Sequence, residues 1–414
     1  MKFKRTLSAL LIIASALTLA TSCKKEPEPE PDLITFTLST SSTETTSDLR
    51  DANGNVIMTA SELKTAYNFF SQYLRDYYYN QYLVYSQYYS IKDFDTFLST
   101  SLSSTDQSVT FESQLRQDIN TRFINYIVCK KQFTDLGLSF TDDDLKEIDD
   151  TYNDMVSTLN ESDGSNVSSA CQKLSITQDQ FKDYIVISGY RSNKLTDYYY
   201  GEDGKEPVTE EDLKENYGKN YTRFKAIILS TTDSNGKTLS DEKLQEVKDK
   251  AADIKAMAKK KGADFEKLID EYSENVYDLS EITGDDNIKA AQEYNDHFRN
   301  IGFLYNENGY EQMFYATSKS ALPSEIMDAA ATLKTGEVTS VTASVGGIWI
   351  IKAYDINESE DLYEGVKDDI WANITSAQFN KLVKQWETAL SYSFNETVRD
   401  SIADPKTREA IFAD

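Results

Sequence analysis

The amino-acid sequence predicts an α+β protein in which an all-helical module is interrupted by a smaller domain of strands and helices. Three observations support this fold class. Apolar residues recur at helical spacing from 56 to 217, strand and helix patterns alternate from 218 to 357, and a helical pattern returns over 358–414. We expect the helical tail that follows the insert to pack back on the helical module.

The helical module is expected to contain five or six helices because helix-start signals repeat along it. Each signal is a Thr followed three residues later by Glu, Asp or Gln, the pattern of a capping box. The four pairs are Thr59/Glu62, Thr141/Asp144, Thr177/Gln180 and Thr209/Asp212. A further helix over 111–136 has an apolar side formed by Leu115, Ile119, Phe123, Ile124 and Ile127.

The helix expected around 67–89 is unusually rich in tyrosine. Its nine tyrosines are at positions 67, 73, 77, 78, 79, 82, 85, 88 and 89. Tyrosine offers a wide contact surface with a polar tip. Ordinary packing between helices is the favoured interpretation of this pattern, and a cradle for unfolded chains is the alternative.

The insert over 218–357 is predicted to form a small domain with an antiparallel sheet. A first strand is expected over 223–229, followed by helices over 240–261, 264–272 and 323–333 and by closing strands over 338–341 and 348–355. Segregated strands and helices of this kind are typical of an α+β domain.

The N-terminus has the pattern of a lipoprotein signal peptide over residues 1–22. A basic start precedes an uncharged, mostly apolar run from Leu7 to Ala20, which is too short to span a bilayer comfortably. The run ends in Ala20-Thr21-Ser22-Cys23, which resembles a lipobox, although Ala20 stands where Leu is more usual. We therefore expect Cys23 to be lipidated; the alternative is an ordinary signal peptide with a chance cysteine.

Residues 23–55 are expected to be a flexible tether behind the lipidated Cys23. Lys, Glu and Pro dominate from 24 to 32, and Ser, Thr, Glu and Asp dominate from 39 to 48, so the segment has little apolar area to bury. No other stretch is apolar enough to cross a bilayer. The sequence thus predicts a body in the cell envelope, held by its lipid anchor on the extracytoplasmic face of a bacterial membrane.

The charge of the chain excludes nucleic acid as a partner. The chain has 43 basic and 69 acidic residues and a formal charge of −26; without residues 1–22 the balance is 40 against 69, or −29. A body this acidic repels nucleic acid and anionic lipid. Contact with the membrane is therefore expected only through the anchor.

Four blocks of the insert resemble the parvulin domain of PrsA- and SurA-type extracytoplasmic foldases. RFKAIIL at 223–229 is similar to the strand pattern R-x-K-H-I-L, and GADFE with YSEN, within 262–275, is similar to G-A-D-F-x-x-L-A-x-x-Y-S-x-D. The stretch 322–338 is similar to M-V-P-E-F-E-D-A-A-F-A-L-K-x-G-E-V, and GIWIIK at 347–352 to G-Y-H-I-I-K. With the lipidated N-terminus and the flanking helices, the likeness spans roughly residues 56 to 395 and implies a chaperone-like helical module.

The resemblance implies a peptidyl-prolyl isomerase pocket whose usual residues are replaced in this chain. The family has a Met and a Phe lining an apolar slot, with two His and an Asp or Cys across its floor. The apolar positions fall on Leu322 and Ile326, so the slot loses its aromatic wall. The two His positions fall on Ala226 and Trp349, and the Asp/Cys position on Asn275. The isomerase domain is therefore predicted to be degenerate.

Other chemistries find little support, and no cofactor or metal is expected. The chain has one histidine, His297, which we expect to be solvated in a polar loop rather than to reach the pocket. One His and two distant thiols give no zinc spacing, and no phosphate loop or nucleophile elbow is present. Cys129 and Cys171 either pair in an oxidising compartment or stay free.

Three functions are compatible with these patterns. The favoured one is a foldase or chaperone that binds unfolded or prolyl-containing exported polypeptides with weak or no isomerase turnover. Because prolyl isomerisation needs no covalent step, an active isomerase that works through pocket shape is the second. A surface lipoprotein that binds one specific partner on the same scaffold is the third.

Overall fold

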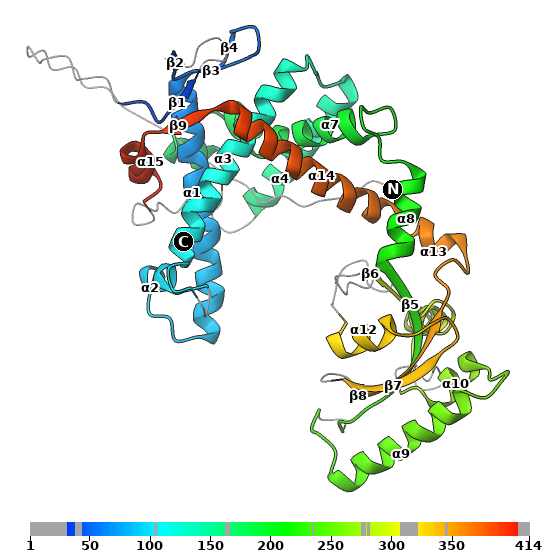
Figure 1. Cartoon of the computed structure of the whole chain (residues 1–414). Coiled ribbons are helices and arrows are strands. Elements are labelled where there is room, and N and C mark those ends of the chain that lie inside the picture. The colour runs from blue at the N-terminus through cyan, green and yellow to red at the C-terminus, as the bar shows by residue number, and fades with distance from the viewer. Residues whose placement is uncertain are drawn as a thin grey trace, which may run out of the picture. The chain divides into compact units, whose positions relative to one another are not determined.

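The chain folds into two compact units that are each described by themselves. The computed structural model describes residues 31–37, 44–102, 106–161, 166–233, 236–274, 279, 282–306, 322–343 and 347–404. The helical unit comprises Met1–Pro207 with Ser376–Asp414, and the sheet unit comprises Val208–Thr375 (Figure 1). The chain is therefore a mixed α+β protein with many helices, as the sequence predicts.

Helices dominate the helical unit. They are α1 (Ala60–Tyr88), α2 (Phe94–Ser99), α3 (Phe111–Asp135), α4 (Asp142–Glu161), α5 (Val167–Lys173), α6 (Gln178–Lys182), the π-helix η1 (Asp183–Ile187), α7 (Ser188–Tyr200) and α15 (Glu396–Ile402), with the C-terminal part of α14 (Lys367–Leu390). The capping pairs at Thr59, Thr141 and Thr177 are confirmed, because each Thr and its partner exchange hydrogen bonds in both directions.

The core of the helical unit forms where α1 packs against α3. All five apolar residues predicted for the inner side of α3 are buried. Tyr67 of α1 lies edge-on to Phe123 of α3, with ring centroids 5.2 Å apart. Val383 and Trp386 of α14 belong to the same apolar cluster. The C-terminal part of α14 is thus built into this core.

Short strands tie both ends of the chain into the helical unit. They are β1 (Ile34–Thr37), β2 (Thr45–Thr46), β3 (Leu49–Arg50), β4 (Val56–Met58) and β9 (Tyr392–Phe394). β1 lies between β2 and β9, and β3 pairs with β4. The expectation of a tether over the whole of 23–55 is wrong for this part, because Leu33, Ile34 and Phe36 are buried in the core. The segment 33–37 is only five residues long and is surrounded by polar residues, so the sequence pattern did not indicate that its apolar side chains are buried.

The sheet unit holds a four-stranded antiparallel sheet. Its elements are α8 (Glu210–Asn220), β5 (Tyr221–Leu229), α9 (Asp241–Ala258), α10 (Phe265–Tyr272), α11 (Asp285–Asn300), β6 (Phe303–Asn306), α12 (Ser324–Ala331), β7 (Val338–Ala343), β8 (Gly347–Tyr354), α13 (Glu360–Glu364) and the start of α14. The strand order is β6-β5-β8-β7. The three predicted strands are confirmed, whereas β6 and α11 are elements that the sequence did not reveal.

The two faces of this sheet are covered by different helices (Figure 1). One face carries Lys225 and Ser340, which contact Glu266 of α10 and Lys255 of α9. The opposite face carries Tyr305, whose hydroxyl donates a hydrogen bond to the carbonyl oxygen of Met327 on α12, 3.4 Å away. The face under α12 also holds the predicted pocket positions.

The sheet unit extends beyond the expected range 218–357 at both ends. Leu213 and Tyr217 of α8 form an apolar cluster with Leu362 and Val366, which follow the sheet in sequence. The Tyr217 hydroxyl also donates a hydrogen bond to the carbonyl oxygen of Ile356, 2.8 Å away. Burial of these residues extends the unit to Val208 and Thr375.

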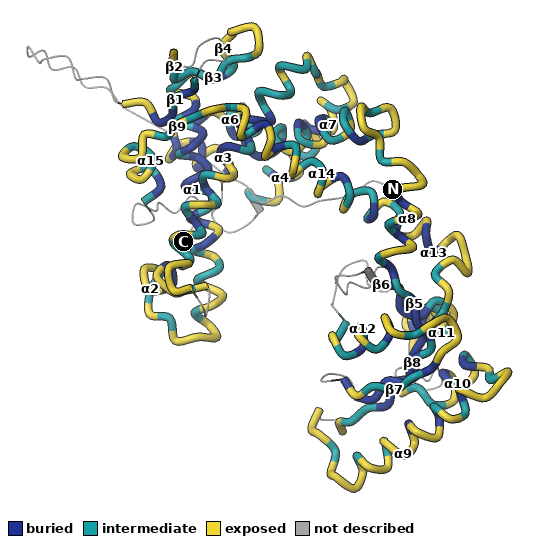
Figure 2. Tube along the Cα trace, viewed as in Figure 1, coloured by how far each residue is buried: buried dark blue, intermediate teal, exposed yellow. Residues whose placement is uncertain are grey.

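Burial is concentrated along α1, α3, β5 and β8 (Figure 2). Within the described ranges, no helix is both long enough and apolar enough to cross a bilayer.

Candidate functional site

Three of the predicted pocket residues are buried in the core of the sheet unit, and a fourth packs against it. Ala226 on β5 and Trp349 on β8 expose 1% and 7% of their surface, and Ile326 on α12 exposes none. Leu322, just before α12, packs half-buried against the same apolar cluster. The fifth, Asn275, lies outside the described residues. Ser273 and Glu274, which precede Asn275, hydrogen-bond to the backbone of Ile228 on β5.

The strand register explains why Ala226 and Trp349, where the parvulin pattern has its two histidines, lie on one face. Ala226 pairs with Ile351, and Ile228 pairs with Trp349. Since paired residues of adjacent strands share a face and side chains alternate along each strand, all four point to the same side. Ala226 and Trp349 are thus diagonal neighbours on the face that α12 covers.

Aromatic rings return to this face from an element that the sequence did not reveal. The Phe303 ring of β6 lies 5.4 Å from the Trp349 ring and stacks on Phe224 of β5 at 5.0 Å. Phe298 of α11 meets Phe303 edge-on at 5.6 Å. Phe303 thus places an aromatic ring beside Trp349, whereas the expectation of a slot without an aromatic wall at Leu322 and Ile326 stays a prediction.

The indole N–H of Trp349 is the polar group of this residue within the apolar cluster. Its indole Nε1 is buried and has no hydrogen-bond partner among the described residues. A buried donor without a partner costs about 1–3 kcal/mol. The indole nitrogen donates a hydrogen bond but does not act as an acid or a base at neutral pH. The described pocket positions therefore hold a donor and apolar surface, and none of them carries a group for acid–base catalysis.

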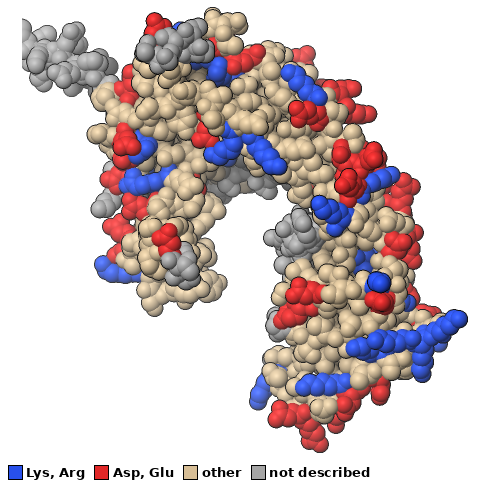
Figure 3. All heavy atoms as spheres, viewed as in Figure 1, with Lys and Arg blue, Asp and Glu red and all other residues tan. Residues whose placement is uncertain are grey.

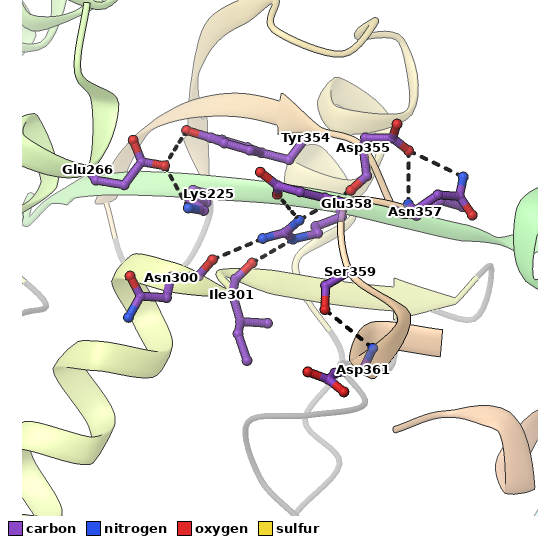
Figure 4. A network of polar contacts seen from close by, with 12 residues as sticks. Lys225, Glu266, Asn300, Ile301, Tyr354, Asp355, Asn357, Glu358, Ser359 and Asp361 are labelled. Atoms are coloured by element: carbon purple, nitrogen blue, oxygen red, sulfur yellow. Dashed lines mark hydrogen bonds and ion pairs between the residues drawn. The ribbon is translucent and has the colours of Figure 1, made fainter. Parts of the chain in front are cut away.

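Arg223, the first residue of the strand block RFKAIIL, has a structural role. Its guanidinium is buried and donates to the carbonyl oxygens of Asn300 and Ile301 at 2.9 and 2.8 Å, where α11 ends. It also bonds Glu358 and the carbonyl oxygen of Asp355, beyond β8 (Figure 4). Arg223 satisfies helix-end carbonyls that would otherwise lack partners. It thereby fixes α11 and the end of β8 to the sheet.

Lys225 and Glu266 join two sequence blocks that are far apart in the chain. The Lys225 Nζ lies 2.6 Å from Glu266 Oε1, and the Tyr354 hydroxyl donates to the same oxygen at 2.8 Å (Figure 4). Burial raises the pKa of Glu266, but the hydrogen bonds from Lys225 and Tyr354 outweigh this effect and lower it overall. The first two parvulin-like blocks therefore each contain one residue of an ion pair that holds α10 on the sheet.

His297 is not in a solvated loop, contrary to the expectation from its polar neighbours. It lies on α11 and is half-buried. Burial lowers the pKa of its imidazole. The polar composition of residues 295–297 resembled a loop because α11 is exposed along much of its length.

The described residues do not assemble a metal site. No group of three or more His, Cys, Asp or Glu side chains converges among them. Cys129 and Cys171 are both buried free thiols, and burial raises their pKa values to about 11 and about 12. Thiols with raised pKa values are poor nucleophiles and metal ligands at neutral pH.

A cavity of about 510 Å³ lies in the helical unit. Its residues come from α1, α3, α14, the segment after it and α15, so sequence patterns could not bring them together. They include Tyr67, Arg116, Asn120 and Arg399. Both arginines have carboxylate partners, because Arg116 bonds Glu112 and Arg399 bonds Asp400, each at 2.8 Å. Both arginines of the cavity therefore already have a counter-charge, and the cavity gives no indication of an anionic ligand.

Comparisons with known proteins point to PrsA structures at a low level of similarity. The foldase protein PrsA from Streptococcus pneumoniae is 17% identical, with 74% of this chain and 99% of that chain covered at a TM-score of 0.25. Peptidylprolyl isomerase PrsA from Bacillus cereus is 18% identical over 75% and 100%, with a TM-score of 0.30. PrsA from Bacillus subtilis is 18% identical over 71% and 92%, with a TM-score of 0.21.

No family model and no curated protein matches the chain. Identities below 20% and TM-scores below 0.5 leave the function to be argued from the residues of this chain.

Proposed function

We propose that this chain is an extracytoplasmic, lipid-anchored foldase that binds unfolded exported polypeptides and has weak or no prolyl isomerase turnover. The observation that carries the proposal is the pair Ala226 and Trp349, buried as neighbours where the parvulin-like pattern has its two histidines. The scaffold around them is intact, with Arg223 and the Lys225–Glu266 pair in place. These contacts, together with the non-ionisable side chains of Ala226 and Trp349, support the proposal of a parvulin-like framework with weak or no turnover.

The absence of ionisable groups at these two positions weakens catalysis of prolyl isomerisation more than it weakens binding of a polypeptide. Rotation about a peptide bond has a barrier of about 18–20 kcal/mol, and a catalyst must favour the twisted amide. Ala226 offers no hydrogen bond, and Trp349 offers one donor. Trp349 and Ile326 are buried, so a proline ring or an aliphatic side chain would bind beside the half-buried Leu322, at the edge of this apolar cluster. Binding without turnover is the function that this chemistry supports best.

Lipidation at Cys23 belongs to the same proposal. The basic, apolar and small-residue runs before Cys23 support an exported lipoprotein, and the polar residues that follow support a spacer from the membrane. The acidic body disfavours direct contact with anionic lipid. We therefore place the protein in a bacterial cell envelope, attached through its N-terminus.

The binding function is tested by an aggregation assay with residues 24–414 and a chemically unfolded model client. The proposal predicts slower aggregation that scales with the amount of protein added, together with binding of unfolded peptides. A folded protein that neither slows aggregation nor binds such peptides would rule the proposal out. Selective capture of a single envelope protein, with no affinity for unfolded chains, would instead support a specific-partner lipoprotein.

Residual isomerase activity is a second candidate function, favoured by the free indole N–H of Trp349. This donor is buried, so a peptide carbonyl oxygen would accept its hydrogen bond only after the bound peptide opens the packing around Trp349. In ¹⁵N-labelled protein, the Trp349 indole signal is expected to shift when a prolyl peptide binds, and Trp349→Phe identifies that signal. The indoles of Trp371 and Trp386 serve as internal references. An unchanged Trp349 signal at saturating peptide would remove this candidate.

A further inference from the structure

Exposed apolar side chains gather at the C-terminal end of α1. Tyr77, Val84, Tyr85, Tyr88 and Tyr89 expose 54%, 55%, 41%, 77% and 62% of their surface. Tyr77, Val84 and Tyr88 recur at spacings of seven and four, which places them on one side of the helix. Tyr85 stacks on Tyr89, with ring centroids 5.9 Å apart. We call these five residues the tyrosine patch.

An aromatic cluster supports the tyrosine patch from beneath. Tyr85 contacts Phe97 of α2 and Phe111 of α3 at 5.8 and 5.9 Å, and these two rings stack at 4.2 Å. Phe97 is fully buried, so α2 is anchored against this end of α1. The patch is therefore presented on a packed base, which lowers the entropic cost of binding.

Other tyrosines of the same helix behave differently. Tyr67 and Tyr78 are buried, and their hydroxyls donate to Asn120 and Asp118 of α3 at 2.8 and 2.6 Å. The packing interpretation of the tyrosine-rich helix is thus confirmed for these tyrosines. It does not account for the tyrosine patch, whose side chains remain exposed.

The tyrosine patch lacks charge in a strongly acidic protein. Residues 77–91 contain no Asp, Glu, Lys or Arg, although the chain carries a formal charge of −26. Figure 2 shows the ends of α1 and α2 as largely exposed, and Figure 3 shows few charged side chains there. Near the patch in sequence, Lys92 is paired with Asp93 at 2.8 Å, whereas Asp95 and Asp106 are exposed. The segment 92–106, which follows the patch in sequence, therefore carries three acidic residues and one basic residue.

We propose that the tyrosine patch binds extended segments of unfolded polypeptide that carry aromatic or aliphatic side chains flanked by Lys or Arg. This inference rests on the proposed function and assigns its main binding surface. Tyrosine rings offer broad apolar area, and their hydroxyls bond backbone groups that an unfolded segment leaves open. Flanking basic residues match Asp95 and Asp106.

Charge also decides against two other occupants of the tyrosine patch. A second copy of the chain would bring the same acidic residues into contact, and like charges oppose association. An anionic membrane surface would be repelled by Asp95, Asp106 and the net charge of the body. Only a partner with an apolar centre and basic flanks satisfies both features of the surface.

The test compares residues 24–414 with the double variant Val84→Gln/Tyr88→Gln. Both side chains are exposed, and glutamine preserves helix propensity, so the fold is expected to persist by circular dichroism. The matched control is Leu145→Gln on α4, an isolated apolar residue of the same unit that is 47% exposed. Fluorescence anisotropy measures binding of a labelled peptide with Phe and Leu at its centre and Lys at both ends.

The proposal predicts about tenfold weaker binding by the double variant, since one or two central aromatic or aliphatic contacts are worth that much. The control should bind like the original chain. Equal binding by the folded double variant would overturn the patch while leaving the proposed foldase function intact. Failure of the original chain to bind any unfolded peptide would overturn both.

Two further measurements separate the alternative occupants. Sedimentation that shows a dimer lost only in the double variant, or binding to anionic vesicles lost in the same way, would assign the tyrosine patch to a second copy or to the membrane. Either result would contradict the proposal. A monomer that ignores vesicles, with peptide binding weakened by added salt, would support it.

Discussion

Asp183 shows how a single carboxylate can organise the interior of the helical unit. Its two oxygens accept hydrogen bonds from Arg191 at 2.6 Å, Lys130 at 2.5 Å and the Tyr126 hydroxyl at 2.6 Å. Burial raises the pKa of Asp183, but the charges of Arg191 and Lys130 outweigh burial, and the pKa is lowered overall. The network therefore depends on an ionised carboxylate between two cations.

Replacing Asp183 with Asn is predicted to destabilise the helical unit by about 3 kcal/mol, because Lys130 and Arg191 lose their counter-charge inside the protein. Urea unfolding followed by circular dichroism measures the loss. The control is Asp150→Asn, which breaks the exposed Lys146–Asp150 pair and should cost less than about 1 kcal/mol. Equal effects of the two substitutions would show that the buried network contributes nothing special.

The Asp183 network also predicts how stability depends on pH. A lowered folded pKa means that the unfolded chain binds more protons, so the contribution is present above the ordinary pKa of aspartate, about 3.9. It is lost as the pH falls through the lower folded pKa. The stability difference between the original chain and Asp183→Asn should therefore shrink in acid. A constant difference from neutral pH down to about pH 2 would contradict the assignment.

Residue patterns in the sequence located the framework of the site better than its chemistry. The pattern that contains Arg223 and Lys225 was visible, but their partners were not, because backbone carbonyls of α11 and a carboxylate on α10 come together only in the fold. That Ala226 and Trp349 stand where the parvulin pattern has histidines stays a prediction from the motif. Burial of the Trp349 indole N–H without a partner required the strand register.

Among the elements, β8 shows most clearly why one residue type is required. Gly347 begins this strand with φ of 106°, and a Cβ there would lie 2.1 Å from the carbonyl oxygen of Leu229 on β5. Only glycine adopts this conformation without strain and allows the two backbones to approach. The glycine of the block GIWIIK is thus explained by the pairing of β5 with β8.

Gly347→Ala is predicted to destabilise the sheet unit by at least about 2 kcal/mol. The added methyl group would clash with the Leu229 carbonyl oxygen, and alanine would have to adopt the positive φ of Gly347. Thermal unfolding checks this prediction. Gly218→Ala on α8 is the control, since no atom lies within 4 Å of the added Cβ and alanine favours a helix. A Gly347→Ala protein as stable as the original would show that β5 and β8 are not held this closely.

Elements that carry their own signals were predictable, and elements defined by distant partners were not. The capping pairs gave the starts of α1, α4, α6 and α8 because both residues of each pair are three positions apart. β6 has only four residues and pairs with β5, about eighty positions earlier in the chain. No local sequence pattern therefore predicts this strand. Similarly, β1 depends on β9 at the other end of the chain.

At the scale of the whole molecule, the chain combines two units for which we propose different roles. The sheet unit has an apolar core that holds Ala226, Ile326 and Trp349, and the helical unit presents an uncharged tyrosine patch on an acidic body. Composition predicted the acidity and the class of partner that it excludes. It could not predict where apolar side chains remain exposed, because that depends on how α1 packs along only part of its length.

The central claim is that this protein binds unfolded chains without accelerating prolyl isomerisation. The most direct test is the isomerisation rate of a prolyl tetrapeptide with residues 24–414 in a protease-coupled assay. The account predicts the uncatalysed rate, with exchange over tens to hundreds of seconds, from a protein that still slows client aggregation. Turnover far above that rate, abolished by Leu322→Ala, would show that the site works by shape alone and would contradict the account.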